Sequence, residues 1–192
     1  MCPKEKILKN VTLKELWELF PVVLTPHQPQ WKHWADDEIE LLSGLLARYS
    51  PVITHIGSTA IPTICAKPIV DILVEIPRVC WCPKESGRPE IRILLENNGY
   101  ICMSESETRM SFNKGYTPDG FADKVFHIHV REVGDNDEIC FRDYLIANPA
   151  AAREYENLKL SLLPEFRHDR DGYTAAKSDF VKRITALAKQ KL

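Results

Sequence analysis

The sequence predicts an α/β (α+β) protein with a mixed central sheet flanked by helices and a helical C-terminal third. Two observations carry this prediction. Short β-rich segments alternate with helical segments as far as residue 130, whereas the segments after residue 137 have only helical patterns. Residues 69–76 are also the most strongly apolar run of the chain, and such a run indicates a strand that is buried on both faces.

The first half of the chain holds two predicted helices and three predicted strands. Residues 12–20 open with a Thr-x-x-Glu capping box and predict a helix. Residues 22–24 are short and apolar and predict a strand. Leucine and isoleucine recur at helical spacing over residues 35–49, which predicts the second helix. Residues 52–56 predict a strand, and we expect it to lie beside the apolar run 69–76, with both at the centre of the sheet.

The second half of the chain begins with a predicted helix over residues 88–98, which Gly99 is suited to cap. Three strands should follow, over residues 100–103, 109–113 and 124–130, with a loop at 115–123 between the last two. Helices are expected over about 138–147, 149–163 and 171–190. The order of elements therefore places the sheet first and most of the helices last.

The bulk composition narrows the classes of function. The chain has 192 residues, of which 44% are hydrophobic and 27% charged, as in an ordinary globular domain. The net charge of −2 gives no global attraction to nucleic acid or to an anionic membrane. No apolar run approaches the ~20 residues that span a bilayer, and the first six residues lack the apolar core of a signal peptide. We therefore expect a cytoplasmic protein that binds neither membranes nor nucleic acid.

The six cysteines give a weak metal signal. Cys80 and Cys82 form a Cys-x-Cys pair, and His127 and His129 form a His-x-His pair far downstream. A Cys2His2 zinc site is one interpretation, although common zinc sites have two close pairs. Reduced cysteines with no role in a site are the more ordinary interpretation in a reducing compartment.

One acidic residue interrupts the apolar run. Asp71 stands between Ile69-Val70 and Ile72-Leu73, and a buried carboxylate without a partner costs several kcal/mol. On a strand, Asp71 and Glu75 would point to the same face, about 13 Å apart. A structural ion pair and a functional carboxylate are equally good interpretations at this point.

A Gly-Ser-Thr turn precedes the apolar run. Gly57, Ser58 and Thr59 follow the strand predicted at 52–56, so their backbone N–H groups and hydroxyls could hold a phosphate. An ordinary turn in which a hydroxyl caps a short helix is the commoner use of such residues. The segment is not a Walker loop, because no Gly-Lys-Ser/Thr follows it.

Several ordered motifs together resemble the GrpB family. They are His-Ile-Gly-Ser-Thr-Ala-Ile-Pro at 55–62, Ala-Lys-Pro-Ile-Val-Asp-Ile at 66–72, Arg-Met-Ser-Phe-Asn-Lys-Gly at 109–115, His-Ile-His-Val at 127–130, Phe-Arg-Asp-Tyr-Leu at 141–145, and Asp-Arg-x-x-Tyr-x-x-x-Lys at 169–177. Asn148-Pro149, Glu154-Tyr155 and Leu158-Lys159 fit as well. The resemblance covers roughly residues 22–188, so residues 1–20 are interpreted as a helical extension of a domain over 21–192.

The resemblance implies a nucleotidyltransferase-like fold and a set of site residues. In that superfamily the Gly-Ser turn holds nucleotide phosphates, and an Asp-x-Asp/Glu pair with a third carboxylate binds two divalent metals, here Mg or Mn. Gly57, Ser58 and Asp71 match this pattern. Leu73 stands where the second carboxylate belongs, and His129 stands at the third position. A single metal held by Asp71, His127 and His129 is an alternative, because imidazole suits Mn, Zn and Fe better than Mg.

Cationic or potentially cationic side chains recur in the same motifs: His55, Lys67, Arg109, Lys114, His127, His129, Arg142 and Lys177, with Tyr173. If they converge on the Gly-Ser turn, they form an anion pocket. Each also has an ordinary explanation, for example a pair of Arg142 with Asp143. We predict one concave site lined by Ser58, Asp71, Arg109, Lys114, His127 and His129, in which Gly57, Ser58, Thr59, Lys67, Arg109 and Lys114 contact phosphate.

Three functions remain open at the level of the sequence. The first is transfer of a nucleotidyl or phosphoryl group, with Asp71 as the catalytic carboxylate. The second is a non-catalytic module that binds a nucleotide or another phosphorylated small molecule, which Leu73 favours. The third is a single-metal hydrolase that uses Asp71, His127 and His129. The sequence indicates neither the base nor the oligomeric state.

Overall fold

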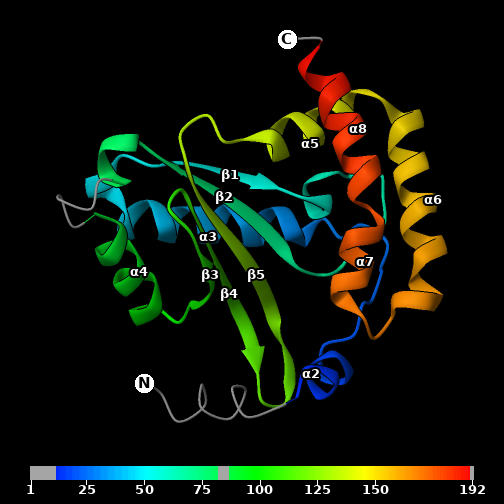
Figure 1. Ribbon diagram of the computed structural model, residues 1–192, viewed down its shortest axis with the longest axis horizontal. Coiled ribbons are helices and arrows are strands. Elements are labelled where there is room, and N and C mark those ends of the chain that lie inside the picture. The colour runs from blue at the N-terminus through cyan, green and yellow to red at the C-terminus, as the bar shows by residue number, and fades with distance from the viewer. Residues whose placement is uncertain (1–11, 82–86, 191–192) are drawn as a thin grey trace.

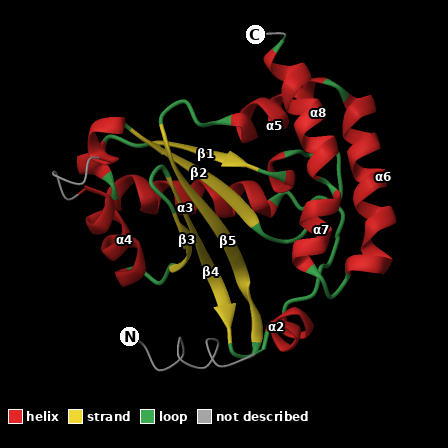
Figure 2. Ribbon diagram, in the orientation of Figure 1, coloured by secondary structure: helices red, strands yellow, loops and turns green. Residues whose placement is uncertain are grey.

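The computed structural model describes residues 12–81 and 87–190, and its centre is a mixed five-stranded sheet (Figures 1 and 2). The strand order is β1-β2-β5-β4-β3, with β1 at Val52–Ile56, β2 at Val70–Ile76, β3 at Ile101–Glu105, β4 at Arg109–Thr117 and β5 at Gly120–Glu132. β2 and β5 are parallel, and the other neighbours are antiparallel. The predicted fold class, a mixed sheet flanked by helices with a helical C-terminal third, is confirmed.

The helices divide into two groups. α2 (Leu13–Leu19), α3 (Gln30–Leu45) and α4 (Gly87–Asn97) belong to the first half of the chain, and α5 (Asp137–Ala147), α6 (Pro149–Phe166), α7 (Arg170–Ala176) and α8 (Ser178–Lys189) form the C-terminal third. Figure 1 shows α3 crossing one face of the sheet, while α6, α7 and α8 stand together at the side of the sheet where β2 begins. No helix in the described ranges has both the length and the apolarity to cross a membrane.

The first α-helix in the described residues confirms its predicted cap. Thr12 and Glu15 form the reciprocal hydrogen bonds of a capping box at the start of α2. After α2, Phe20 is buried against the rings of Tyr116 and Phe121. The chain around residue 20 therefore packs on the tip of the β4–β5 hairpin.

The structure corrects several expectations about the strands. Residues 22–24 form no strand, and the only pairing nearby is an isolated bridge between Thr25 and Ala66. β1 lies beside β2 as predicted, but it is an edge strand rather than a central one. The predicted loop at 115–123 is mostly strand, because Gly115, with a φ of +88°, forms a bulge beyond which the ladder resumes at Tyr116 and Phe121.

Two helices also differ from their predicted bounds. α3 begins at Gln30 rather than at residue 35, so its first turns include Trp31 and Trp34. The helix expected over 171–190 is two helices, α7 and α8, which meet at Lys177. Cys82 lies outside the described residues, so the Cys-x-Cys interpretation does too.

The alternation of side chains gives the sheet two different faces. On β5, Phe126, Ile128 and Val130 point to the side of α3 and α4 and join the main hydrophobic core. His127, His129 and Arg131 point to the opposite side, toward the C-terminal helices. A second apolar cluster inside those helices, which includes Phe141, Leu145, Tyr155 and Phe180, holds them together. The polar face of the sheet and this helical group enclose the candidate site.

Candidate functional site

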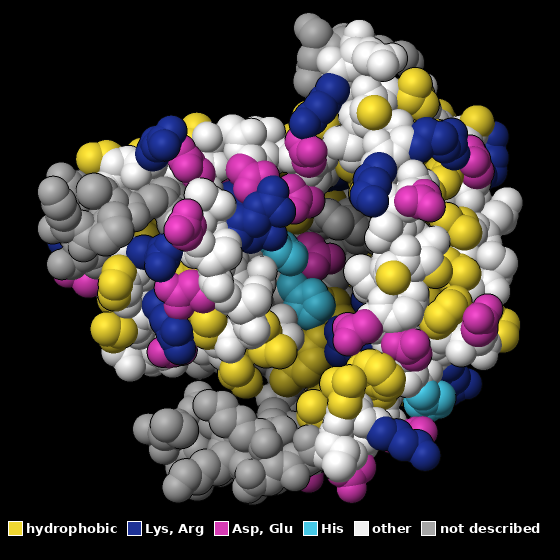
Figure 3. All heavy atoms as spheres, in the orientation of Figure 1, with side chains coloured by type: hydrophobic (Ala, Val, Ile, Leu, Met, Phe, Trp, Pro, Cys, Tyr) yellow, Lys and Arg dark blue, Asp and Glu magenta, His cyan; other side chains and the backbone are white. Residues whose placement is uncertain are grey.

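A cleft of about 750 Å³ separates the polar face of the sheet from the C-terminal helices. Figure 3 shows histidine and acidic side chains in the depth of this hollow, with the C-terminal helices on one side of it. The lysines and arginines on its wall outnumber the carboxylates, seven to four. The cleft is therefore cationic, although the chain as a whole carries a net charge of −2.

Asp71, His127 and His129 meet on the floor of the cleft. The parallel register pairs Asp71 of β2 with His127 of β5, and the same face of β5 carries His129. Asp71 Oδ1 lies 3.2 Å from His127 Nδ1 and 3.4 Å from His129 Nε2. These ligand-type atoms all lie within 4.8 Å of one another. The structure thus brings together the three side chains that the sequence analysis grouped as metal ligands.

The environment of this trio favours an ionised Asp71 carboxylate and a neutral His127 imidazole. Burial by itself would raise the pKa of Asp71, but hydrogen bonds and charge from His127 and His129 outweigh it and lower the pKa. Burial lowers the pKa of His127 by more than the neighbouring Asp71 raises it. A neutral imidazole can still donate one N–H to Asp71, so the carboxylate is satisfied without a charged histidine.

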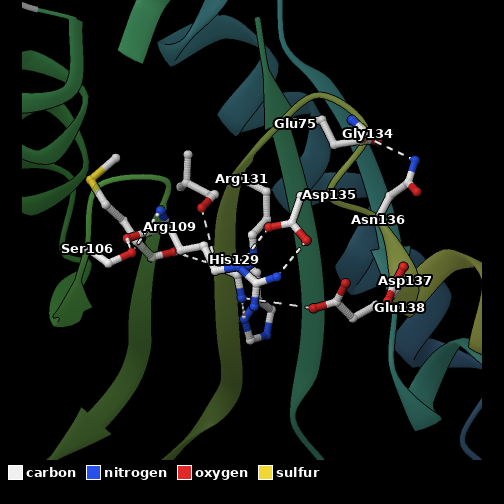
Figure 4. Close-up of polar contacts among 12 residues, drawn as sticks. Glu75, Ser106, Arg109, His129, Arg131, Gly134, Asp135, Asn136, Asp137 and Glu138 are labelled. Carbon is white, nitrogen blue, oxygen red and sulfur yellow. Dashed lines mark hydrogen bonds and ion pairs between the residues drawn. The ribbon is translucent and has the colours of Figure 1, made fainter. Parts of the chain in front are cut away.

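Two guanidinium groups stand behind the histidines. Tyr116 Oη lies 2.8 Å from His127 Nε2 and accepts a hydrogen bond of 2.7 Å from Arg170 Nη2. Arg131 Nη2 lies 3.4 Å from His129 Nδ1, as Figure 4 shows. Each histidine is therefore held from both of its ring nitrogens.

The Gly-Ser-Thr turn meets Asp71 at close range. Gly57 has a φ of +72°, and a Cβ at this position would lie 2.5 Å from Asp71 Oδ2, so only glycine fits. Ser58 opens a single 3₁₀ turn (Ser58–Ala60) and accepts a hydrogen bond of 3.4 Å from Lys159 Nζ. Thr59 is buried, and its hydroxyl pairs with His55 Nε2 at 2.9 Å. Gly57 and Ser58 thus line the cleft, whereas Thr59 points into the fold.

Three lysines converge on the other wall of the cleft. Burial, and then the charges of Lys177 and Arg170, lower the pKa of Lys67 to about 7. Burial and the charge of Lys177 lower the pKa of Lys159 to about 8. Burial also lowers the pKa of Lys177. Lys67 and Lys177 both lie over the ring of Tyr173, at 5.7 and 4.6 Å from its centroid.

Besides Thr59, two more of the predicted phosphate contacts lie outside the cleft. Lys114 points to the opposite face of the sheet, where it pairs with Glu38 of α3 at 2.6 Å. Arg109 shares the face of His129 but forms a two-point ion pair with Asp135 and does not line the cleft (Figure 4). The prediction of one concave site that includes both residues is therefore wrong. Strand parity explains Lys114, because one step along β4 from Asn113, the partner of His127, reverses the face.

Two other predicted cations, Arg142 and His55, form contacts within the fold and do not line the cleft. Arg142 donates to the carbonyl of His55 at 2.6 Å and forms an ion pair with Asp143. The ion pair with Asp143 is the ordinary explanation that the sequence offered for Arg142. Burial lowers the pKa of His55 to about 4. Lys159, Arg170 and Arg131 also line the cleft, although they were not among the predicted site residues. The first two stand inside the quoted motifs, so the motif itself was the available signal.

The site does not fit a two-ion magnesium centre. Leu73, which the resemblance places at the position of the second carboxylate, is fully buried and offers no ligand atom. His129, which it places at the position of the third carboxylate, has the guanidinium of Arg131 next to Nδ1. By ligand type alone, the remaining set of one carboxylate and two imidazoles would suit a transition metal better than magnesium.

Comparisons with known proteins agree on one family. The family model described as GrpB protein matches residues 21–187. The chain is 36% identical to the glutamate-rich protein GrpB of Alkalihalophilus pseudofirmus, over 85% of this chain and 93% of that protein. It is 35% identical to a UPF0157 protein of Pseudomonas aeruginosa, over 87% of this chain and 67% of that protein. The crystal structure of the conserved protein GrpB from Enterococcus faecalis superposes with a TM-score of 0.74 at 29% identity, covering 88% of this chain and 98% of that one.

Proposed function

The chain belongs to the GrpB family, and we propose that it binds a phosphorylated small molecule, with a nucleotide as the first candidate, in the cationic cleft. One observation carries the proposal. Lys67, Lys159 and Lys177 share a cleft wall, and within the described residues the lysines that form salt bridges are four others, Lys32, Lys114, Lys124 and Lys189. Burying like charges together is unfavourable, and a bound polyanion removes that cost.

The floor of the cleft complements these charges. Ser58 offers a hydroxyl, and the glycine before it lets the turn approach the site closely. Ammonium groups and hydroxyls are the donors that bind phosphate oxygens, and each charge-assisted hydrogen bond contributes roughly 1.5–3 kcal/mol. A volume of about 750 Å³ is within the range typical of small-molecule sites.

Turnover is a separate question from binding. The resemblance to nucleotidyltransferase-like enzymes supports group transfer, with Asp71 as the catalytic carboxylate, but Leu73 offers no second metal ligand. A single-metal hydrolase is the second candidate, because the ligand atoms of Asp71, His127 and His129 lie within 4.8 Å of one another. Binding through the lysines needs no metal, so metal dependence separates the candidates.

The test is calorimetric titration of the protein with ATP, GTP, CTP, UTP and inorganic pyrophosphate, each with EDTA and with Mn²⁺. We expect saturable binding of at least one of them in EDTA. Lys67→Met and Lys177→Met should each weaken it by roughly 10- to 100-fold, which corresponds to one lost charge-assisted bond. Lys124→Met is the matched control, because Lys124 is 46% exposed and pairs with Asp37 outside the cleft.

Two outcomes would overturn the proposal. The first is that none of these anions binds at millimolar concentration in either condition. The second is that Lys124→Met weakens binding as much as the cleft variants do. Binding that appears only with Mn²⁺ would instead favour the second candidate.

A further inference from the structure

The trio on the cleft floor is the centre of a continuous hydrogen-bond chain with a guanidinium at each end. The chain runs from Arg170 through Tyr116 to His127, then to Asp71 Oδ1, and on through His129 to Arg131. A guanidinium can only donate, and an ionised carboxylate can only accept. The two guanidinium groups and the Asp71 carboxylate therefore constrain which ring nitrogens of the histidines carry protons.

On the Arg131 side, the positions of the protons follow directly. Arg131 Nη2 donates to His129 Nδ1 at 3.4 Å, so Nδ1 must carry a lone pair. The proton of the neutral imidazole is then on Nε2, which donates to Asp71 Oδ1 at 3.4 Å. In this tautomer the nitrogen of His129 that faces Asp71 has no lone pair to offer a metal ion.

The Arg170 side is less restrictive. His127 Nδ1 donates to Asp71 in the same way, and its Nε2 accepts from the hydroxyl of Tyr116. A phenol oxygen can also accept, so this histidine could move its proton to Nε2, donate it to Tyr116 and free Nδ1. His129 has no such freedom, because a proton on Nδ1 would face the N–H groups of Arg131.

Arg131 is firmly held in this position. Its side chain is 8% exposed, and Nη1 donates to the carbonyls of Met110 and Val130, each at 3.2 Å. The nearest carboxylate oxygen of its ion pair, on Glu138, is 3.9 Å away. The backbone carbonyls, rather than a carboxylate, fix the guanidinium behind His129.

We infer that Arg131 is a specificity residue that holds His129 as the Nε2–H tautomer and so keeps divalent cations off Asp71, His127 and His129. A histidine that binds a metal normally donates its other N–H to an acceptor, and here that position holds a donor. The cleft thereby stays selective for anions. This inference does not rest on the proposed nucleotide binding.

The direct test is the tautomer of His129 in the wild-type protein. Long-range ¹H–¹⁵N correlation spectra of histidine-labelled protein, with the signal assigned by His129→Asn, should show the proton on Nε2. This measurement needs no variant of Arg131, so it decides the issue even if such a variant does not fold. A proton on Nδ1 would overturn the inference.

The second test is metal affinity, measured by Co²⁺ absorption and by calorimetry with Zn²⁺, without nucleotide. The wild type should bind either ion weakly, and Arg131→Gln should bind at least tenfold more tightly, because the glutamine carbonyl can accept a hydrogen bond from Nδ1. Adding His129→Asn should abolish the gain. Arg109→Gln is the control, since Arg109 is the cross-strand neighbour of Arg131 but pairs with Asp135.

Two results of the metal titrations would contradict the inference. Micromolar Co²⁺ or Zn²⁺ binding by the wild type that is lost in His129→Asn would show that Arg131 does not exclude metal. An equal gain in Arg131→Gln and Arg109→Gln would show that only the overall charge matters. Neither result bears on whether anions bind in EDTA, so failure of this inference and failure of the proposed function are distinguishable.

Discussion

The two faces of the sheet differ in the partners of their buried charged side chains. On the packed face, Lys114 lies 2.6 Å from Glu38, which also accepts a hydrogen bond of 2.5 Å from the buried Tyr100. On the cleft face, Lys67 has other cations as neighbours, and burial and those cations lower its pKa to about 7. The charge of Lys114 on the packed face is neutralised by an ion pair within the protein, whereas the charge of Lys67 in the cleft remains available to a ligand.

A single strand repeats the contrast for carboxylates. Glu75 and Asp71 lie on the same face of β2. Glu75 is buried and accepts hydrogen bonds from the backbone N–H of Gly134 and from Asn136 (Figure 4). Asp71 is held by two histidines in the cleft. Glu75 therefore has closed hydrogen bonds within the fold, whereas Asp71 lies in the cleft with two histidines as partners and no Lys or Arg ion pair among the described residues. The functional role of Asp71 stays a prediction.

The largest effect should come from breaking the closed network on the packed face. Glu38→Ala removes the partner of Lys114 and of the Tyr100 hydroxyl together, so we expect the free energy of unfolding to fall by about 3 kcal/mol. Urea denaturation followed by circular dichroism measures this loss. A loss below about 1 kcal/mol would mean that Lys114 finds water as readily as it finds Glu38, and the contrast between the faces would fail.

The second effect concerns the turn that supports the cleft face. Gly57 and Gly99 both have positive φ, at +72° and +85°, but a Cβ would meet Asp71 only at Gly57. Gly57 also has a ψ of −173°, a backbone conformation that residues other than glycine avoid. Gly57→Ala should therefore destabilise the protein by about 2–3 kcal/mol, and Gly99→Ala by about 1 kcal/mol. Equal losses in urea denaturation would mean that neither the contact with Asp71 nor the backbone conformation of Gly57 adds a cost.

Sequence patterns predicted those elements of the fold whose pattern is explained by a single kind of structure. The run 69–76 can be apolar on both faces only as a covered strand, and the capping box of α2 is a purely local signal. The edge position of β1 was not predictable, because an edge strand covered by a helix has the composition of a central one. Here α5 packs beside β1, and Arg142 donates to the carbonyl of His55.

The candidate site was predictable in part for the same reason. Asp71 and the His-x-His pair were grouped because the family resemblance placed His129 at the third carboxylate position. Alternation fixed the face of each strand, and the pairing of β2 with β5, which no sequence pattern states, brings the three side chains together. Lys114 was misplaced because the face of β4 depends on its register with β5, which the sequence does not state. Lys159 and Arg170 come from helices that reach the cleft only through tertiary packing.

The third effect is a pH dependence produced by the cleft face. A lysine whose pKa falls from 10.5 to about 7 on folding holds its proton more tightly in the unfolded state. Between about pH 7 and 10.5 the unfolded state therefore binds more protons, and stability rises with pH. Lys67→Met should reduce the gain in stability between pH 7 and 9 by about 2 kcal/mol. Lys124→Met should leave this gain unchanged, and a steeper gain in Lys67→Met would contradict the assignment.

The smallest effect isolates burial from pairing. Glu154 accepts from Arg183 at 2.6 Å, the same distance as between Glu38 and Lys114, but the Arg183 and Glu154 side chains are 50% and 56% exposed. Water already solvates both groups, so Glu154→Ala should change the free energy of unfolding by about 0.5 kcal/mol or less. The same urea experiment as for Glu38→Ala measures it. A loss as large as that of Glu38→Ala would mean that the pair distance, and not the exclusion of water, sets the value of a charge in this protein.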